Sequence, residues 1–230
     1  GTYDESDHAK LISQYFDTNH YELDGGDIST TILDSLVKQF DEPVCDSSMI
    51  PTFLVTKLVK NYCTVAIGGD GGDELFGGYM HYPRLLFLKK YFSFIPLFIR
   101  NLITSMSNEV MPIGFKGRNW INGINYDFNT NVPQINLLYD KHSRLRLFEN
   151  DIFDKKMNHD LRKVDINPDL DFISRAMQLD FHHYLREDIL VKTDRTSMLN
   201  SLELRSPMLD KDILEFAFNL RPEFKVNTKY

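Results

Sequence analysis

The stretch that decides the fold is VAIGGDGGDELFGGY, residues Val65–Tyr79. It contains six glycines and three acidic residues, Asp70, Asp73 and Glu74, directly after a short apolar run. Glycine admits positive φ angles and lets a ligand approach the backbone closely. The stretch is therefore typical of a strand that ends in a flexible, acidic loop, which could be a solvated turn, a metal loop or part of a nucleotide site.

The residues on either side of this loop predict an α/β layer. Residues 49–62 have apolar residues at helical spacing. Residues 63–69, CTVAIGG, are short, rich in β-branched residues and ended by glycine, which predicts a buried strand. Helix, buried strand, glycine-rich loop and helix in this order indicate a parallel sheet.

Helical periodicity covers most of the remaining chain. After Tyr79 no convincing strand is visible, and the Met, Phe and Tyr residues at helical spacing predict a helical core. We expect an α/β part over residues 1–80 and a mainly α-helical part over residues 81–230. Further helices are predicted over residues 5–16, 28–40 (with Asp27 as N-cap), 144–157, 169–185, 188–202 and 210–220, and a short strand over residues 20–23.

Composition argues against several classes of function. The formal net charge of −7 disfavours a nucleic-acid backbone or an anionic membrane as the main partner. The apolar-rich residues 85–103 are interrupted by charged residues and a proline, so they are not expected to span a membrane. No signal peptide is visible, and we expect a cytoplasmic protein. Cys45 and Cys63 have neither metal-ligand spacing nor a disulfide framework, which favours two buried thiols.

Common nucleotide and metal patterns do not fit the glycine-rich loop, Gly68–Gly78. A Walker loop needs Lys-Ser/Thr where the chain has Tyr79, and the dinucleotide pattern needs glycine at Glu74. The acids also lack EF-hand spacing. Backbone N–H groups at the end of a parallel strand can bind anions, and carboxylates there suit Mg²⁺ shared with a phosphate. From spacing alone, a solvated turn and a nucleotide site are equally open interpretations.

Three blocks of sequence favour the nucleotide site over the solvated turn. They are DEPVCDSSMIPTFL (residues 41–54), GGDGGDELFGGY (residues 68–79) and LREDILVKTDRTSMLNSLELRSPMLDKDILEFAFNL (residues 185–220). In order and composition they resemble the synthetase domain of glutamine-dependent asparagine synthetases, and the resemblance covers nearly the whole chain. It implies part of the parallel sheet of the adenine-nucleotide alpha-hydrolase-like (ATP pyrophosphatase) fold, followed by a mainly α-helical lobe.

The resemblance also implies an activity, that of a carbon–nitrogen ligase with glutamine as amido donor. In this family ATP activates the side-chain carboxylate of aspartate as β-aspartyl-AMP, and ammonia then displaces AMP to give asparagine. The implied cofactors are ATP and Mg²⁺. The implied partners are aspartate, ATP, ammonia or glutamine, an N-terminal glutaminase domain of the parent chain and a second copy in a homodimer. No nucleic acid and no membrane are expected.

Carried over to this sequence, the family's main roles fall on the glycine-rich loop. Asp70 and Asp73 are the implied catalytic residues. Asp70 lies beside the activated carboxylate, and Asp73 holds Mg²⁺ together with pyrophosphate. The ATP- or AMP-binding residues are Gly68, Gly69, Asp70 and Gly71. Gly68 departs from the family, which usually has serine there, so a hydroxyl contact is in doubt.

The second and third blocks supply the substrate side of the site. The resemblance places Asp46, Ser47 and Lys192 there, although N-capping of the following helix is an equally open role for the serines. Lys192, Asp194 and Arg195 are expected to form an ion-pair network that is mainly structural, because buried charges must be paired.

Three parts of the family pattern do not occur in these 230 residues. They are the pyrophosphate loop SGGxDSS, the N-terminal cysteine of the glutaminase, and the R-x-K-x-G-F segment, which is expected beyond Tyr230. We therefore expect a piece of a longer protein that folds at least partly, leaves a sheet edge uncovered and is inactive by itself.

Two alternatives remain open at this stage. One is a homologue with another acceptor, such as the relatives that close β-lactam or lasso-peptide rings or amidate sugars. The other is a non-catalytic assembly module.

Overall fold

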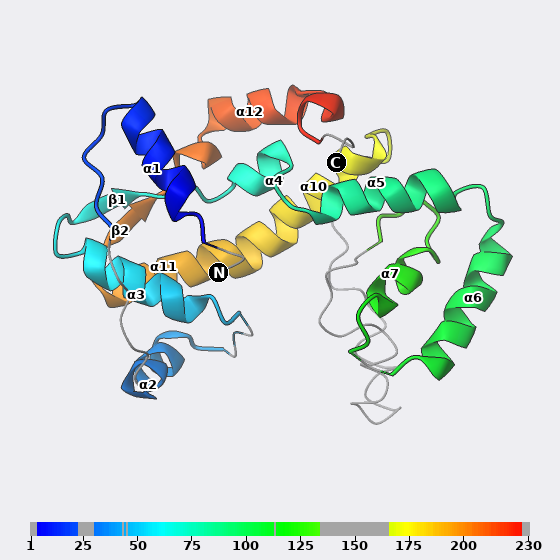
Figure 1. The fold of residues 1–230 in the computed structure, drawn as a ribbon, viewed down its shortest axis with the longest axis horizontal. Helices are drawn as coiled ribbons and strands as arrows, with labels where there is room; N and C mark the ends of the chain where they lie inside the picture. The colour runs from blue at the N-terminus through cyan, green and yellow to red at the C-terminus, as the bar shows by residue number, and fades with distance from the viewer. Residues whose placement is uncertain are drawn as a thin grey trace. The chain divides into compact units, whose positions relative to one another are not determined.

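The computed structural model describes residues 4–22, 30–42, 44, 46–112, 114–133 and 166–226. In these ranges the chain is mainly helical, with a two-stranded parallel sheet (Figure 1). It forms two compact units, the first from Gly1–Ala66 and Lys192–Leu204, the second from Ile67–Val191 and Arg205–Tyr230. Each unit is thus built from two separate stretches of chain. The expected division into residues 1–80 and 81–230 stays a prediction.

The first unit is helical. Its helices are α1 (Ser6–Tyr15), α2 (Thr30–Gln39), α3 (Met49–Val59) and most of α11 (Leu190–Leu199), which confirms the helices predicted in these regions. Asn200, just after α11, joins this helix to α3, because its amide donates to the Phe53 carbonyl and the Thr56 hydroxyl, both at 2.9 Å. Leu36 and Leu202 are fully buried.

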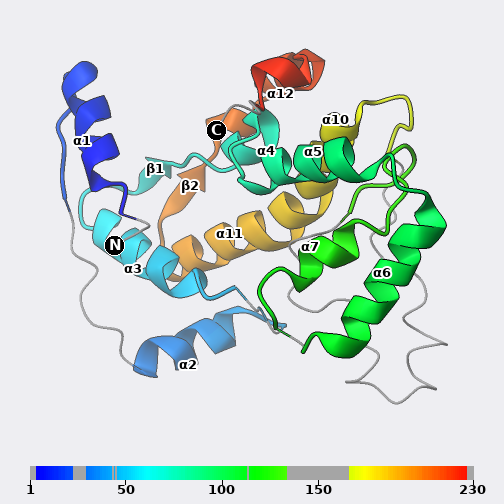
Figure 2. The ribbon, with the colours of Figure 1, turned by 45° about the vertical axis from the view of Figure 1, so that its right-hand side comes forward.

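The second unit packs around α5 and α10. Figure 2 shows α5 beside α10, and α6 beside α7. Its elements are α4 (Gly72–Phe76), α5 (His81–Phe92), α6 (Leu97–Val110), α7 (Arg118–Gly123), α10 (Phe172–Asp180), the π-helix η1 (Phe181–Ile189), the 3₁₀-helices η2 (Pro207–Leu209) and η3 (Pro222–Phe224), and α12 (Lys211–Asn219). Its core consists of Tyr82, Leu85, Leu88, Ile124, Phe128, Phe172, Ile173, Ala176, Met177 and Val226.

The helical prediction over residues 169–185 and 210–220 is confirmed, with one difference. Residues 181–189 form a π-helix, a rare conformation that is frequent at functional sites. Apolar spacing did not distinguish it from an α-helix. The π-helix is continuous in sequence with α10 before it and α11 after it.

The sheet corrects two expectations. It pairs β1 (Val65–Ile67) with β2 (Glu203–Arg205), whereas no strand was expected after Tyr79. A three-residue strand is too short to show alternation, so its sequence gives no strand signal. β1 is also not buried, since Ile67 is 75% exposed. In the described part of the chain β1 pairs only with β2, and the outward side chains are left uncovered.

The prediction that Met and Phe residues at helical spacing form the core is wrong for two residues of α6. Phe98 and Met106 on this helix are 72% and 61% exposed. The buried face of α6 is polar instead. Arg100 donates to the carbonyls of Ile124 (2.8 Å) and Tyr126 (2.7 Å). None of the described helices has the length and apolar content needed to cross a membrane.

Some expectations fall partly or wholly outside the described residues. These are the N-cap Asp27, the helix over residues 144–157 and the thiol of Cys45. Residues 20–22 of the predicted short strand are described and form no strand. Cys63 is half-buried rather than buried, with its Sγ 3.7 Å from the Val59 carbonyl oxygen.

Candidate functional site

The glycine-rich loop of the second unit is shaped by two residues with positive φ. Gly71 (φ +91°) precedes α4 and Gly77 (φ +72°) follows it. A Cβ at Gly71 would lie 2.4 Å from Leu209 Cδ2, and one at Gly77 would lie 2.7 Å from Val226 Cγ2. Both conformation and space therefore require glycine at these positions.

Asp73 is an exposed residue in the first turn of α4. Its carbonyl accepts from the N–H groups of Gly77 (2.9 Å) and Gly78 (3.1 Å). Its carboxylate lies against Gly78 so closely that a Cβ there would be 1.9 Å from Asp73 Oδ1. The turn after α4 thus holds the backbone of Asp73, and the side chain of Asp73 lies over Gly78.

Asp70 lies between β1 and α4 and is half-buried. The Ser206 hydroxyl, just after β2, lies at a long hydrogen-bond distance of 3.4 Å from Asp70 Oδ2. Ser206 was missed from the sequence because its proximity arises from the pairing of β1 with β2. The N–H of Gly68 donates to the Arg205 carbonyl at 2.8 Å and continues that pairing to the start of the loop.

The remaining loop glycines have space around them. A Cβ at Gly69 would meet no heavy atom within 4 Å. At Gly68 it would lie 3.5 Å from Asp70 Oδ2, which is ordinary van der Waals contact. The position can therefore accommodate the serine that the family usually has, next to the carboxylate of Asp70.

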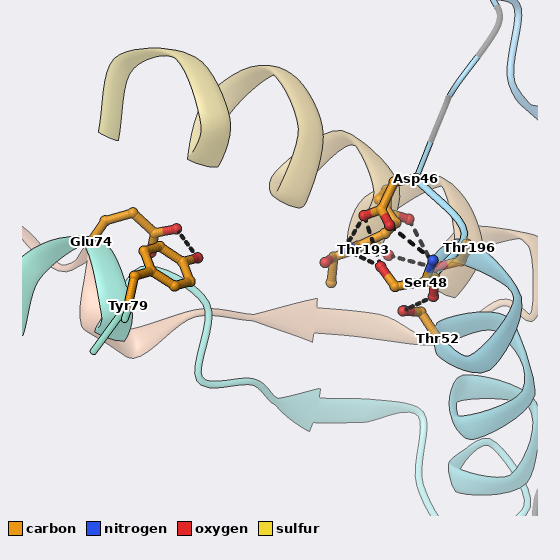
Figure 3. Close-up of polar contacts among 8 residues, drawn as sticks. Asp46, Ser48, Thr52, Glu74, Tyr79, Thr193 and Thr196 are labelled. Carbon is orange, nitrogen blue, oxygen red and sulfur yellow. Dashed lines mark hydrogen bonds and ion pairs between the residues drawn. The ribbon is translucent and has the colours of Figure 1, made fainter. Parts of the chain in front are cut away.

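Glu74, on α4, is buried and paired. Tyr79 donates its hydroxyl proton to Glu74 Oε1 at 2.5 Å, and Glu74 is 1% exposed (Figure 3). Burial raises the pKa of Glu74, and the hydrogen bond from Tyr79 limits that rise. Burial and then the Glu74 carboxylate raise the pKa of Tyr79, so the phenol stays protonated and is the donor. The sequence singled out Glu74 only as one of the three acids of the loop, and Tyr79 was not predicted to contribute to the site.

A second polar group, the Lys192 cluster, lies in the first unit and consists of Asp46, Ser48 and Lys192. Asp46 and Ser48 are labelled in Figure 3. Lys192 Nζ donates to Asp46 Oδ2 (2.6 Å) and to Ser48 Oγ (2.7 Å). The Ser48 hydroxyl donates to Asp46 Oδ2 at 2.7 Å, which closes the triangle. Burial acts to raise the pKa of Asp46, but the bonds from Lys192 and Ser48 outweigh it and hold this pKa below its usual value.

This cluster refines the predicted substrate side. Asp46 and Lys192 come together, whereas Ser47 is exposed and the neighbouring Ser48 makes the contacts. Ser48 stands at the N-cap of α3 but makes no side-chain cap bond, because its hydroxyl is directed to Asp46.

The expected network around Lys192 has different partners. Arg195 donates to Asp41 Oδ2 at 3.1 Å and to the Gln39 carbonyl at 3.0 Å, and Lys192 bonds Asp46. The cations of α11 therefore pair with acids from residues 41–46 rather than with Asp194 of their own helix.

The chemistry available to the loop is that of oxygen ligands and exposed backbone. Within the described ranges no group of three or more His, Cys, Asp or Glu side chains could form a complete metal cage. Mg²⁺ does not need one, because it usually takes one or two protein carboxylates and completes its shell with phosphate oxygens and water. The exposed Asp73 carboxylate suits such a shared site.

The family model for asparagine synthase matches residues 1–230. The chain belongs to the asparagine synthase family. Asparagine synthetase (glutamine-hydrolyzing) 1 of Bacillus subtilis (strain 168) is 32% identical over 218 residues, which cover 86% of this chain and 32% of the relative. A provisionally named asparagine synthetase (glutamine-hydrolyzing) of Mycobacterium tuberculosis (strain ATCC 25618 / H37Rv) is 29% identical over 211 residues, covering 86% and 31%.

The asparagine synthase match is thus to part of longer proteins. The chain spans about a third of the length of the curated relatives, 32% and 31% for the two named above. A third relative, provisionally named asparagine synthetase (glutamine-hydrolyzing) 2 of Methanocaldococcus jannaschii, is 37% identical over 105 residues, covering 44% of this chain and 19% of the relative. No solved structure matches the chain.

Proposed function

We propose that this asparagine synthase domain is part of an ATP-dependent asparagine synthetase with the adenine-nucleotide alpha-hydrolase-like fold. One observation carries the proposal. The glycine-rich loop begins at the carboxyl end of β1, which pairs in parallel with β2, and it carries the exposed Asp73. Ligands of open α/β sheets bind at the carboxyl ends of the strands. Family membership supplies the reaction class.

The proposed reaction has two steps. An oxygen of the aspartate side-chain carboxylate attacks the α-phosphorus of ATP, and the bond to pyrophosphate breaks. Ammonia derived from glutamine then attacks the acyl carbon, AMP leaves, and asparagine forms after loss of a proton. We assign Gly68, Gly69 and Gly71 to nucleotide binding, where backbone N–H groups can stabilise charge on the phosphate. Asp70 lies beside the reacting carboxylate.

Asp73 is the proposed ligand of Mg²⁺. Its carboxylate is exposed and lies over Gly78, where the absence of a side chain leaves room for it, so the position suits an ion shared with a pyrophosphate. When bound, Mg²⁺ would neutralise the negative charge that develops on the pyrophosphate leaving group.

In this proposal the Lys192 cluster has a structural role and stabilises the first unit. The Lys192 ammonium already bonds Asp46 and Ser48 within 2.7 Å, so its charge is compensated inside the first unit. The exposed Ser47 is the member of this region that stays available to a substrate.

The test uses the full-length protein that contains this chain and measures aspartate-dependent ATP–pyrophosphate exchange with Mg²⁺. We expect Asp73→Asn to reduce exchange by about a hundredfold or more, the scale on which a lost transition-state contact acts. Glutamine hydrolysis is the control and should not change. Near-normal exchange by Asp73→Asn would contradict the metal assignment, and wild-type protein without any aspartate-dependent exchange would contradict the proposed substrate.

We also propose that residues 1–230 alone do not catalyse the reaction. The sequence contains no SGGxDSS loop, so the donors that hold pyrophosphate in the family are not among its residues. Aspartate-dependent exchange by the isolated chain would overturn this part of the proposal.

A further inference from the structure

The turn after α4 folds back and is tied to that helix by a side-chain bond. Gly77 takes a left-handed conformation, and three residues after Phe76 the Tyr79 hydroxyl reaches Glu74 Oε1 at 2.5 Å. We call Glu74 and the turn Gly77–Tyr79 the tyrosine clamp. A buried carboxylate is costly without a donor, and Tyr79 is the side chain that supplies one here.

The tyrosine clamp contacts Asp73, the residue next to Glu74. Two of its N–H groups, from Gly77 and Gly78, bond the Asp73 carbonyl, and the Asp73 carboxylate lies directly over Gly78. A shift of the turn relative to α4 would therefore change the backbone at Asp73 and the space over Gly78 in which its carboxylate lies. The Tyr79–Glu74 bond is the side-chain link that fixes this relation.

The clamp is anchored on its other side to the core of the second unit. The ring of Tyr79 stacks on His81, with centroids 5.3 Å apart and an interplanar angle of 19°. His81 Nε2 lies 2.7 Å from Asp180 Oδ2 at the end of α10. Tyr184 of the π-helix contacts the edge of Tyr79, with centroids 5.8 Å apart. These contacts hold Tyr79 against the second unit.

We propose that Glu74 and Tyr79 are positioning residues, which hold the Asp73 carboxylate in the orientation that binds Mg²⁺ with pyrophosphate. This inference rests on the proposed function, because it assigns the clamp a role in the same reaction. Residues that orient a metal-binding carboxylate typically change metal affinity or activity by about 10- to 100-fold when they are replaced. A purely structural pair would change stability and leave metal affinity as it was.

The experiment measures Mn²⁺ binding in the presence of pyrophosphate, by electron paramagnetic resonance, in the full-length protein that contains this chain. Tyr79→Phe removes the hydroxyl and keeps the ring. We expect it to weaken Mn²⁺ binding by about tenfold and to raise the Mg²⁺ concentration for half-maximal exchange to the same extent. Glu74→Gln keeps an acceptor for Tyr79 and should stay within about twofold of wild type. Tyr91→Phe, at a 54% exposed tyrosine of the same unit, is the matched control and should have no effect.

A second variant serves as the control for a loss of stability. Tyr79→Phe leaves the Glu74 carboxylate without its donor and can destabilise the fold, whereas Glu74→Leu/Tyr79→Phe replaces both partners with apolar groups. We expect the double variant to fold and to bind Mn²⁺ about tenfold more weakly. Wild-type Mn²⁺ affinity in either folded variant would overturn the proposal, and so would failure of both to fold, since the pair would then serve the fold alone.

Asp73→Asn separates this inference from the function on which it rests. If Asp73→Asn abolishes exchange while the clamp variants bind Mn²⁺ normally, the positioning role is wrong and the proposed function stands. If Asp73→Asn binds Mn²⁺ and exchanges normally, the metal assignment itself is wrong.

Discussion

The glycine-rich loop and the Lys192 cluster are built in opposite ways. In the loop, the contacts that hold Asp73 come from residues four and five positions further along the chain, and they depend on missing side chains at Gly77 and Gly78. In the Lys192 cluster, Lys192 bonds residues 146 and 144 positions earlier, and the contacts depend on charge.

This difference predicts two kinds of sensitivity. Atoms added at Gly77 or Gly78 collide with Val226 and the Lys225 backbone or with Asp73, so small changes at these two positions should impair binding. Loss of one charge in the Lys192 cluster leaves its partner half-buried and uncompensated, so the cost should appear in stability. The predictions below test this contrast, from the largest expected effect to the smallest.

Among the variants that test this contrast, the largest effect is expected for Gly78→Ala in the full-length protein. Its Cβ would lie 1.9 Å from Asp73 Oδ1, so the carboxylate must leave its position. We expect Mg²⁺-dependent exchange to fall by about 10- to 100-fold. Gly72→Ala in the same loop is the control, because a Cβ there meets nothing within 4 Å apart from its chain neighbours and the backbone of its own helix. Equal activity of the two variants would show that Gly78 does not fix Asp73.

Lys192→Met tests the other side of the contrast. The side chains of Lys192 and Asp46 are 11% and 19% exposed, so the remaining carboxylate loses its partner in a mostly buried place. We expect local opening of α3, measured by hydrogen exchange, to become easier by about 2 kcal/mol. Lys211→Met, at an 83% exposed lysine paired with Glu215, should change stability by less than about 0.5 kcal/mol. If Lys192→Met and Lys211→Met change stability equally, the Lys192 cluster does not stabilise α3.

The Lys192 cluster also predicts a pH dependence. The pKa of Asp46 is held below its ordinary value of 3.8, so the pair stabilises the fold above that value and is lost as pH falls through the lowered pKa. The difference in Tm between wild type and Lys192→Met should be constant near neutral pH and shrink below about pH 4. A difference that persists unchanged to pH 3 would mean that Asp46 is not the partner that matters.

The smallest effect is expected for Gly68→Ser, which restores the family's usual residue. A Cβ there makes only ordinary contacts, at 3.5 Å to Asp70 Oδ2 and 4.0 Å to the Arg205 carbonyl oxygen. We expect the free energy of unfolding, followed through Tm, to change by less than about 0.5 kcal/mol. A large loss of stability would show that this end of the loop is as tightly packed as Gly77 and Gly78.

The same contrast explains which features the sequence predicted. Helices such as α3 and α12 were predicted because their apolar periodicity is local, and the loop was recognised because its glycines stand together. β2, Ser206 near Asp70 and the pairing of Lys192 with Asp46 were not predicted, since each depends on residues far apart in the chain.

Two local features were also missed. The π-helix Phe181–Ile189 has the apolar spacing of an α-helix, and no sequence rule that we applied separates the two. The Tyr79–Glu74 bond spans five residues, a separation at which side chains do not meet on a regular helix; they meet here because Gly77 reverses the chain. The site roles of Asp70, Asp73 and the loop glycines stay predictions.

The separation of Lys192 from Asp46 has a consequence for synthesis of the protein. Asp46 leaves the ribosome 146 residues before its partner. At translation rates of about 5–20 residues per second, this delay lasts roughly 7 to 30 s. During that time Lys192 is not there to compensate the charge of Asp46, and the first unit lacks its last stretch, Lys192–Leu204. The first unit can therefore complete its fold only after the long segment of the second unit, Ile67–Val191, has been made.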